Sequence, residues 1–331
     1  MGTPLGPPGG YRLVRPAVSV STPPELDAAQ RTVVGHTRGP LLALGAPGTG
    51  KTTTLVESVA ARAAEVPADR ILILTFGRRM ATRLRRQLAV RLGDRSGAAA
   101  FSAEPVVRTF HGYAFGLLRR AATARGAPEP RLLSGPEQDL AIRELIEAGV
   151  AEERFAAGWP ETLRPALRTR GFASELRDLL LRAAERGIPA ERLADWGHDL
   201  GRPDWPAAAR FATQYAEVLA LRDAAGHGSV AYDPAELIRA AIGLLTEDAE
   251  VLAAERDRFR YCYVDELHDS DPAQLELLEL VAGGGRHLVA FGDPDSSTFA
   301  FRGADPAGVT GFPARFPTAP GTLAPTVVLW T

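Results

Sequence analysis

Gly45-Ala-Pro-Gly-Thr-Gly-Lys51-Thr52 matches the complete phosphate-loop pattern G-x-x-x-x-G-K-S/T. Lys51 is the only lysine of the chain, which otherwise takes its positive charge from arginine. At this position a compact ammonium is needed to reach between phosphates, and a planar guanidinium does not fit. A chance match is the alternative, but the apolar run Leu41–Leu44 before the loop and the helix-forming residues Thr52–Val56 after it supply the strand and helix that such a loop requires. We therefore predict a nucleotide-binding site formed by Gly45, Ala46, Pro47, Gly48, Thr49, Gly50, Lys51, Thr52 and Thr53.

The composition is that of a soluble globular protein. Its 331 residues allow about two domains, and 45% of them are hydrophobic and 24% charged. No apolar run approaches the roughly 18–20 residues that cross a bilayer, and the Gly- and Pro-rich segment Met1–Gly10 does not resemble a signal peptide. Cys262 is the only cysteine, so it forms no intramolecular disulfide, and its apolar neighbours predict a buried strand position. We therefore expect a cytoplasmic protein with no membrane partner.

The charge balance bears on nucleic-acid partners. A formal net charge of −2 argues against a protein dedicated to coating nucleic acid, but it leaves open a locally basic groove on an acidic body. One predicted helix carries a basic cluster of Arg78, Arg79, Arg83, Arg85 and Arg86. Such runs are usually a solvated surface, and we interpret Arg83, Arg85 and Arg86 in this way.

Strand and helix signals alternate in the first third of the chain. Strands are predicted at Leu41–Leu44, Ile71–Leu74, Val106–Arg108, Tyr261–Val264, Leu288–Phe291 and Thr326–Leu329. Several of them are short apolar runs without alternation, which is typical of strands buried on both faces of a parallel sheet. Helices are predicted at Leu26–His36, with a cap near Thr22, and at Thr52–Ala64 and Arg78–Leu92. The alternation of strand and helix predicts an α/β fold with a parallel sheet.

Between about Gly116 and Glu247 the strand signals vanish, and Arg/Ala/Leu/Glu-rich helical segments follow one another. Ser134 and Asp233 are predicted helix N-caps, each with an acidic residue three positions later. We interpret this region as an all-helical insertion between the third and fourth strands of the sheet. The expected domains are therefore 17–115 and 248–331 for the two segments of the α/β domain, and 116–247 for the insertion.

A second chemical landmark is Tyr261-Cys-Tyr-Val-Asp265-Glu266, an apolar strand that delivers two carboxylates at its carboxyl end. With a phosphate loop, this pair suits the hydrolysis of Mg·ATP: Asp265 would hold Mg²⁺ with the Thr52 hydroxyl, and Glu266 would polarise the attacking water. A solvated turn is the alternative. We take Lys51, Asp265 and Glu266 as the candidate catalytic residues.

Five segments, in order along the chain, resemble the motifs of the UvrD/Rep-type superfamily 1 DNA helicases. They are Leu26-Asp-Ala-Ala-Gln30, Ile71–Ala81, Arg108-Thr-Phe-His-Gly112, Asp265–Gln274 and Gly292–Asp305, with the phosphate loop between the first two. The resemblance implies a RecA-like phosphate-loop NTPase domain interrupted by a helical insertion, with ATP and Mg²⁺ as cofactors. It implies single-stranded DNA and tailed duplex DNA as partners. The Arg-rich segment after Ile71 and the Gly/Pro-rich N-terminus are most similar to the helicase–nuclease subunits of GC-rich bacteria, which would add a second subunit as a partner.

The same resemblance assigns roles to single residues. Gln30 would bind the edge of the adenine base through its amide, and Arg302 would be one of the nucleotide-binding residues. The residues expected to contact DNA are Phe76, Phe299 and Phe301 by stacking on bases, Thr109 and His111 on the strand backbone, and Arg78 on phosphates. For each phenylalanine, packing in the core is the alternative.

The chain also departs from the family pattern. Leu267, His268 and Ser270 replace motif residues after Glu266, and Ser296 stands where the family has a glutamine that senses the γ-phosphate. His268 has no second ligand at a suitable spacing, so we interpret it as a substituted motif residue and not as a metal ligand. The second motor domain of the family would follow Leu329, and without its arginines we expect hydrolysis to fall by about 10³–10⁵-fold.

We therefore expect the ATP-binding half of an ATP-dependent DNA helicase, cut before the second motor domain. Such a protein couples hydrolysis to movement along single-stranded DNA, in the family's 3′-to-5′ direction, in repair or recombination. One alternative is a catalytically weak ATP- and DNA-binding subunit of a helicase–nuclease complex. The other is a different phosphate-loop enzyme such as a small-molecule kinase, which would leave Thr109–His111 and Phe299–Arg302 without a role.

Overall fold

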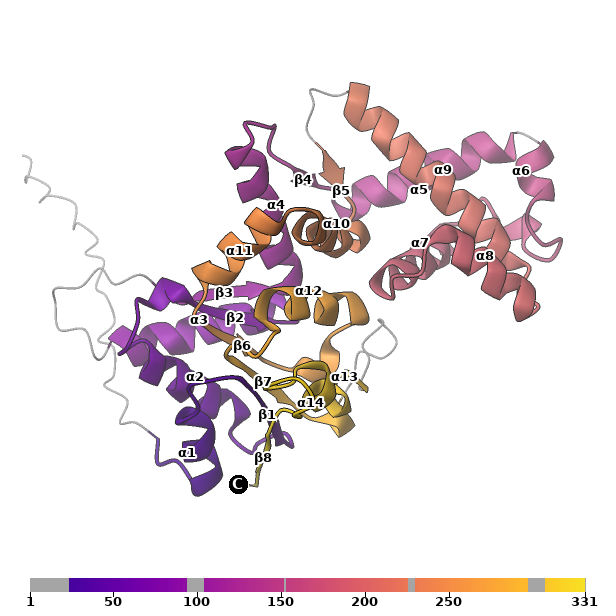
Figure 1. Ribbon diagram of the computed structural model, residues 1–331. Helices are drawn as coiled ribbons and strands as arrows, with labels where there is room; N and C mark the ends of the chain where they lie inside the picture. The colour runs from indigo at the N-terminus through magenta and orange to yellow at the C-terminus, as the bar shows by residue number, and fades with distance from the viewer. Residues whose placement is uncertain (1–23, 94–103, 152, 226–229, 297–306, 331) are drawn as a thin grey trace, which may run out of the picture.

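A parallel six-stranded sheet forms the centre of the computed structural model, which describes residues 24–93, 104–151, 153–225, 230–296 and 307–330 (Figure 1). The strand order is β3-β2-β6-β7-β1-β8, and each pairing is parallel. The strands are β1 (Pro40–Gly45), β2 (Ile71–Thr75), β3 (Val106–Thr109), β6 (Tyr261–Val264), β7 (Leu288–Gly292) and β8 (Thr326–Leu329). The predicted strands and the predicted α/β class are confirmed.

The central strands are buried on both faces, which explains why they read as continuous apolar runs. In β2, Ile71 and Ile73 face one core and Leu72 and Leu74 face the other. The thiol of Cys262 in β6 is buried, as its neighbours predicted, and burial raises its pKa to about 12.

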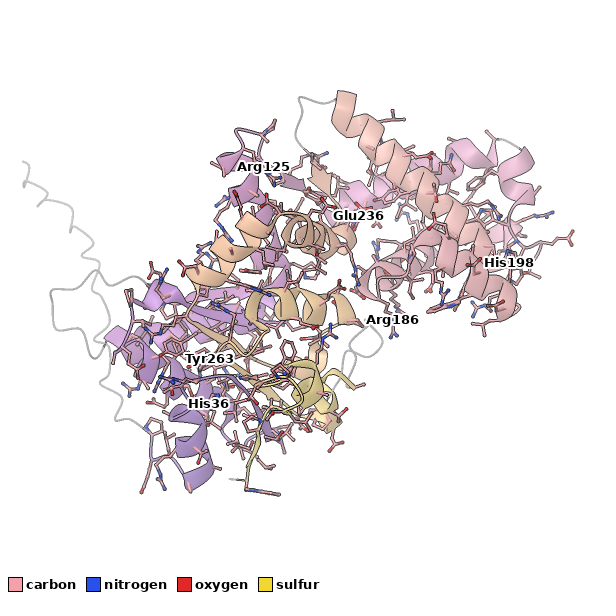
Figure 2. All side chains as sticks on the ribbon, in the orientation of Figure 1. His36, Arg125, Arg186, His198, Glu236 and Tyr263 are labelled. Carbon is pink, nitrogen blue, oxygen red and sulfur yellow. The ribbon has the colours of Figure 1, made fainter. Side chains whose placement is uncertain are left out.

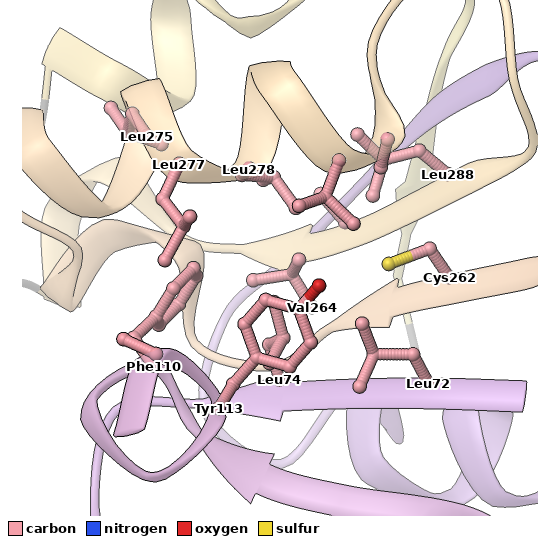
Figure 3. Packing of buried hydrophobic residues seen from close by; sticks show 14 of the residues in the cluster. Leu72, Leu74, Phe110, Tyr113, Cys262, Val264, Leu275, Leu277, Leu278 and Leu288 are labelled. Atoms are coloured by element: carbon pink, nitrogen blue, oxygen red, sulfur yellow. The ribbon is translucent and has the colours of Figure 1, made fainter. Parts of the chain in front are cut away.

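Two sets of helices cover the two faces of the sheet. One face packs against α1 (Ala28–Val34), α2 (Lys51–Arg62) and α3 (Arg78–Gly93). The other packs against α4 (Phe110–Ala124), α10 (Pro234–Glu247) and α12 (Pro272–Ala282), with α13 (Ala307–Thr310) and α14 (Phe312–Arg315) beside them. Figure 3 shows this second core, where Phe110 and Tyr113 meet the leucines of α12 above β2 and β6. The helix α11 (Ala249–Arg258) leads into β6.

The first helix begins later than predicted. It starts at Ala28, and its N-cap is Asp27, whose side chain accepts a hydrogen bond from the backbone of Gln30. The Gln30 side chain accepts one in return from the backbone of Asp27, which completes a capping box. The predicted start at Leu26 is therefore wrong because Asp27 is the better cap; Thr22 lies outside the described residues.

The helical insertion has a core of its own. It contains α5 (Gly135–Val150), α6 (Glu153–Ala157), α7 (Arg170–Glu185), α8 (Ala190–Asp199) and α9 (Asp204–Ala225). A two-stranded parallel ribbon of β4 (Arg131–Leu132) and β5 (Ala231–Tyr232) lies at its base. Figure 2 shows how far it reaches: His198 lies at the distal end of this arm, whereas His36 and Tyr263 lie in the sheet domain.

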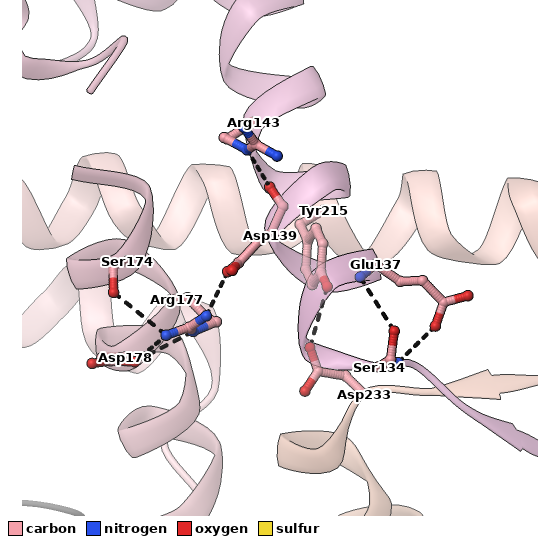
Figure 4. A network of polar contacts seen from close by, with 9 residues as sticks. All are labelled: Ser134, Glu137, Asp139, Arg143, Ser174, Arg177, Asp178, Tyr215 and Asp233. Carbon is pink, nitrogen blue, oxygen red and sulfur yellow. Dashed lines mark hydrogen bonds and ion pairs between the residues drawn. The ribbon is translucent and has the colours of Figure 1, made fainter. Parts of the chain in front are cut away.

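A network of hydrogen bonds and ion pairs connects several polar side chains of the insertion (Figure 4). Ser134 caps α5 with a full capping box, which confirms its predicted role. Arg177 bonds Asp139 and Asp178, and Tyr215 donates to the Asp233 carboxylate at 3.2 Å. In the described residues no helix is both long and apolar enough to span a membrane.

Candidate nucleotide-binding site

The phosphate loop lies between β1 and α2 and is shaped by its glycines. Gly48 and Gly50 have φ of 91° and 80°, a left-handed conformation that favours glycine. Gly45 has no room for a side chain, because a Cβ there would lie 2.3 Å from the Thr49 hydroxyl. The Thr49 hydroxyl donates to the Ala46 carbonyl at 2.9 Å and closes the loop. The loop therefore curls in front of the first turn of α2, whose free backbone N–H groups attract anions.

Lys51 is the buried cation of this loop. Its side chain is 8% exposed, and Nζ donates to the carbonyls of Gly45 at 2.7 Å and Ala46 at 3.2 Å. Thr52 is half-buried and Thr53 exposed on the same helical turn. A cavity of about 430 Å³ borders this turn and is lined by Thr52, Thr53, Arg83 and Arg86 among others. The only lysine of the chain thus holds its charge inside the curve of the loop.

Asp265 lies at the carboxyl end of β6, on the edge of the sheet where the phosphate loop also lies. The residue is 1% exposed, and neither carboxylate oxygen has a hydrogen-bond partner. Burial, together with the charge of Glu266, raises the pKa of Asp265 to about 7 against the opposing charge of Lys51. A buried carboxylate without a partner is costly unless a cation compensates it. The oxygen donors Asp265 and Thr52 fit Mg²⁺, which is commonly held by one or two carboxylates together with substrate phosphates.

Glu266 is held by a histidine that the sequence did not identify as functional. Glu266 is the one non-glycine residue with a positive φ among the described residues, at 54°, which turns its side chain away from the strand direction. His268 Nε2 lies 3.1 Å from Glu266 Oε2, and His268 Nδ1 accepts the backbone N–H of Asp293 at 3.2 Å. These two contacts fix the Nε2–H tautomer. His268 is therefore a buried link between the carboxylate pair and the end of β7 (3% exposed).

The chain of contacts from Glu266 through His268 to Asp293 continues beyond β7. The Asp293 carboxylate accepts hydrogen bonds from the Ser296 hydroxyl and, at 3.1 Å, from the Asp295 backbone. No cluster of three or more His, Cys, Asp or Glu that could hold a metal occurs in the parts of the chain with described positions, so His268 belongs to no metal cluster there. Residues 297–306, which follow Ser296, lie outside the described structure, and with them the predicted contacts Phe299, Phe301 and Arg302.

Gln30 lies against the back of the phosphate loop. It is 7% exposed, and its amide Nε2 is 3.5 Å from the Thr49 carbonyl. A Cβ at Gly50 would lie 2.4 Å from the same nitrogen, so the amide fills the space that glycine leaves. The structure therefore brings Gln30 to the loop; its contact with adenine stays a prediction.

The predicted DNA-contacting residues gather at the carboxyl ends of β2 and β3. Phe76 follows β2 and is half-buried, and Arg78 is exposed at the first turn of α3. The Thr109 hydroxyl caps α4 by accepting from the backbone of Gly112 at 3.0 Å. Burial lowers the pKa of His111, and nearby Arg78 lowers it further. These residues share one edge of the sheet with the phosphate loop, but DNA contact itself stays a prediction.

Comparison with known proteins identifies the family of this chain. Residues 26–317 match the family model described as the UvrD/REP helicase N-terminal domain. The chain belongs to this family. Its UvrD/REP domain is 30% identical to ATP-dependent DNA helicase UvrD2 of Mycobacterium tuberculosis, over 89% of this chain and 40% of the relative. It is 28% identical to ATP-dependent DNA helicase UvrD1 of Mycobacterium leprae (88% and 36%) and 26% identical to ATP-dependent DNA helicase PcrA of Staphylococcus aureus (89% and 36%).

The family membership confirms the resemblance found in the sequence motifs. The chain spans about two-fifths of the length of these curated relatives. Within its UvrD/REP domain, the substitutions His268 and Ser296 lie next to each other in space through Asp293. Sequence reasoning treated the two as separate departures, because nothing in one sequence shows that His268 contacts Asp293, 25 positions away.

Proposed function

We propose that this chain is the ATP-binding half of an ATP-dependent DNA helicase, which couples ATP hydrolysis to movement along single-stranded DNA and to duplex unwinding. The observation that carries the proposal is the buried, unpartnered Asp265 carboxylate at the same sheet edge as Lys51 and the phosphate loop. The names of the relatives support DNA as the substrate. For the whole protein we propose 3′-to-5′ movement and a cytoplasmic role in repair or recombination.

ATP and Mg²⁺ are the proposed cofactors, with Thr52 and Asp265 as the metal ligands. Bound Mg²⁺ would neutralise charge that develops on the phosphates during transfer. The loop backbone and Lys51 bind the phosphates, Gln30 orients the base, and Glu266 orients the attacking water and accepts its proton. Lys51 leaves the carbonyls of Gly45 and Ala46 when phosphate oxygens replace them as acceptors.

His268 acts in this scheme as a positioning residue for Glu266. Its Nε2–H holds one carboxylate oxygen of Glu266, which leaves the other oxygen for water. Through Asp293 it also ties Glu266 to Ser296, the last described residue before the segment with the proposed base-stacking phenylalanines. The link therefore supports a path by which DNA contact adjusts the water-activating carboxylate.

The proposed domain organisation keeps 17–115 and 248–331 as the α/β domain and 116–247 as the insertion. The second half of α4 and the whole of α10 lie inside the insertion range, yet both helices pack on the core of the sheet. They anchor the insertion, and Arg239 of α10 connects it further by bonding Glu276 of α12 at 2.6 Å and the Ala184 carbonyl of α7 at 3.2 Å.

A catalytically weak subunit of a helicase–nuclease complex is the second candidate. The observation that favours it is that the Ser296 hydroxyl donates its hydrogen bond to Asp293, so this hydrogen is not available to a phosphate. Replacing Ser296→Gln in the full-length protein discriminates between the candidates. A gain in DNA-stimulated turnover supports the helicase, and no gain supports the weak subunit.

The proposal is tested by the binding of a fluorescent ATP analogue with Mg²⁺ to the native chain and to Lys51→Ala. We expect micromolar binding, about −8 kcal/mol, by the native chain, and a loss of about 100-fold in the variant. Arg222→Ala in the insertion is the matched control, since it removes an exposed cation far along the chain. Equal binding by native chain and Lys51→Ala would show that the loop is not the site.

A further inference from the structure

Four arginines converge at the outer edge of the sheet, on the strand β3. Arg85 of α3 donates through Nε and Nη2 to the carbonyl of Val107 at 3.2 and 2.9 Å, and Arg108 of β3 donates to the same oxygen at 3.0 Å. On the α4 side, Arg120 Nη1 lies beside Gly116, and the Arg108 side chain lies beside Gly112. Arg258, at the end of α11, completes what we term the edge arginine cluster.

The cluster carries more positive charge than its surroundings compensate. Arg120 and Arg258 share one buried carboxylate, Glu255, at 2.6 and 3.5 Å. Within the described part of the chain, neither Arg85 nor Arg108 forms an ion pair. The cluster thus holds four guanidinium groups and one carboxylate, which pairs with Arg120 and Arg258 only.

This arrangement is electrostatically unfavourable without an anion. Partial burial lowers the pKa of Arg108, and the neighbouring charges of Arg85, Arg258 and Arg120 lower it further. Two guanidiniums on one carbonyl oxygen leave most of their N–H donors unused, and each presents a planar fork that matches phosphate oxygens. The side chains of Arg85 and Arg108 are exposed, so an incoming anion can reach them.

We propose that the edge arginine cluster binds the phosphodiester backbone of a nucleic-acid strand. Arg108 directly precedes Thr109, at the end of β3 where the proposed DNA-contacting residues lie. A strand that passes Thr109 and His111 meets the cluster when it continues over this edge of the sheet. The cluster is separate from the phosphate loop. The proposal rests on the proposed function only because it takes nucleic acid as the polyanion.

The geometry also predicts a dependence on strand length. A short oligonucleotide can be held at the ends of β2 and β3 without reaching Arg85, Arg120 or Arg258. A longer strand covers both places and gains the additional phosphate contacts. The cluster therefore contributes sequence-independent affinity that appears only above a minimum length.

The test compares Arg85→Gln/Arg108→Gln with Arg125→Gln/Arg222→Gln in the 331-residue chain. Both double variants remove two positive charges, but Arg125 and Arg222 are exposed and paired with Asp248 and Glu144. Binding of fluorescent oligothymidylates of about 6 and about 20 nucleotides is measured by anisotropy over a range of salt concentrations. The fluorescent ATP analogue is titrated in parallel.

For the longer strand we expect the cluster variant to bind at least about fivefold more weakly and to lose about 1.4 from the slope of log K against log salt, which is two phosphate contacts at about 0.7 each. The short strand, the control variant and nucleotide binding stay unchanged. Arg85→Lys/Arg108→Lys restores the slope, because it keeps the charge, and melting curves show that each variant is folded.

An unchanged salt slope in the Gln variant overturns the proposal, as does a native chain that binds the nucleotide but no strand at low salt. A native chain that binds the long strand through Arg85 and Arg108 but binds no nucleotide leaves the cluster standing and contradicts the proposed function instead.

Discussion

The sheet edge and the helical insertion differ in how their polar side chains are partnered. From the carboxyl end of β6 into α12, Asp265, Ser270 and Gln274 carry buried oxygens without hydrogen-bond partners. In the insertion, the partly exposed Arg177 bonds two aspartates and Tyr215 bonds Asp233, although one buried oxygen of Glu185 has no partner. Unsatisfied buried groups persist where a ligand compensates them, whereas satisfied networks make a structure unique and stable. The unpartnered Asp265 beside the phosphate loop therefore marks the binding region, whereas the bonded network of the insertion helps to fix its shape.

The largest expected effect is a loss of stability in the insertion that leaves nucleotide binding in the sheet domain unchanged. Phe211 of α9 is 1% exposed in the insertion core. Phe211→Ala should lower the free energy of unfolding of the insertion by about 3–5 kcal/mol. Affinity for the fluorescent ATP analogue should stay within about twofold of the native value, because the sheet has its own core.

Denaturant unfolding and nucleotide titration check this pair of results. Leu221→Ala on the same helix is the control, since Leu221 is 69% exposed and its truncation should have little effect. Loss of nucleotide binding by folded Phe211→Ala would mean that the two regions are not separate.

The next effect concerns acid stability at the end of the sheet opposite to the site. His287 is packed between the rings of His36, Tyr261 and Tyr263. Burial, together with the charges of His36 and Arg62, lowers its pKa to about 3. Between about pH 6.5 and pH 3 the unfolded chain therefore binds a proton that the folded protein excludes, and stability falls as the pH falls.

The expected slope is up to about 1.4 kcal/mol per pH unit, or about 2 kcal/mol lost at pH 5. His287→Phe removes this acid-dependent loss of stability. The unfolding free energy of the variant, relative to that of the native chain, should therefore increase on acidification. Urea unfolding at pH 7 and pH 5 measures it. A difference that does not change with pH contradicts the neutral, buried histidine.

A smaller effect tests whether His268 positions Glu266. His268→Ala leaves Glu266 free to rotate, and we expect the basal rate of ATP hydrolysis to fall about tenfold with unchanged affinity for the nucleotide. His268→Gln should recover most of the rate, because its amide can donate to Glu266 and accept from the Asp293 backbone. His198→Ala, in an exposed position of α8, is the control.

Nitrogen NMR of the native chain provides an independent readout, since the structure requires the Nε2–H tautomer for His268. The opposite tautomer, or equal rates for the Ala and Gln variants, would show that His268 does not position Glu266.

Local patterns predicted most of the fold. The strands, the phosphate loop, the buried Cys262 and the cap at Ser134 each depend on a short stretch of sequence, and the structure confirms them. The cap of α1 was missed because Thr22-Pro-Pro and Asp27 both suit a helix start, and only the capping box with Gln30 distinguishes them.

Contacts between distant segments account for what the sequence could not show. His268 meets Asp293 from the neighbouring strand, and Arg85 meets Arg108 from a helix across the sheet edge. The helix α10 continues the pattern of the insertion, yet its apolar face packs on the sheet. None of these partners follows from spacing, because the register of the sheet decides which residues meet.

The most direct test of the account is to make one chemical change in each region and compare the signs. Asp265→Asn removes a buried negative charge without a partner, whereas Asp139→Asn removes a half-exposed negative charge that is bonded to Arg177. Unfolding free energies without ligand, and binding of the ATP analogue with and without Mg²⁺, are measured at pH 8. The account predicts that Asp265→Asn is more stable than the native chain and loses the Mg²⁺-dependent part of nucleotide affinity, while Asp139→Asn is slightly less stable and binds normally. An Asp265→Asn variant that is destabilised and still shows Mg²⁺-dependent binding would contradict it.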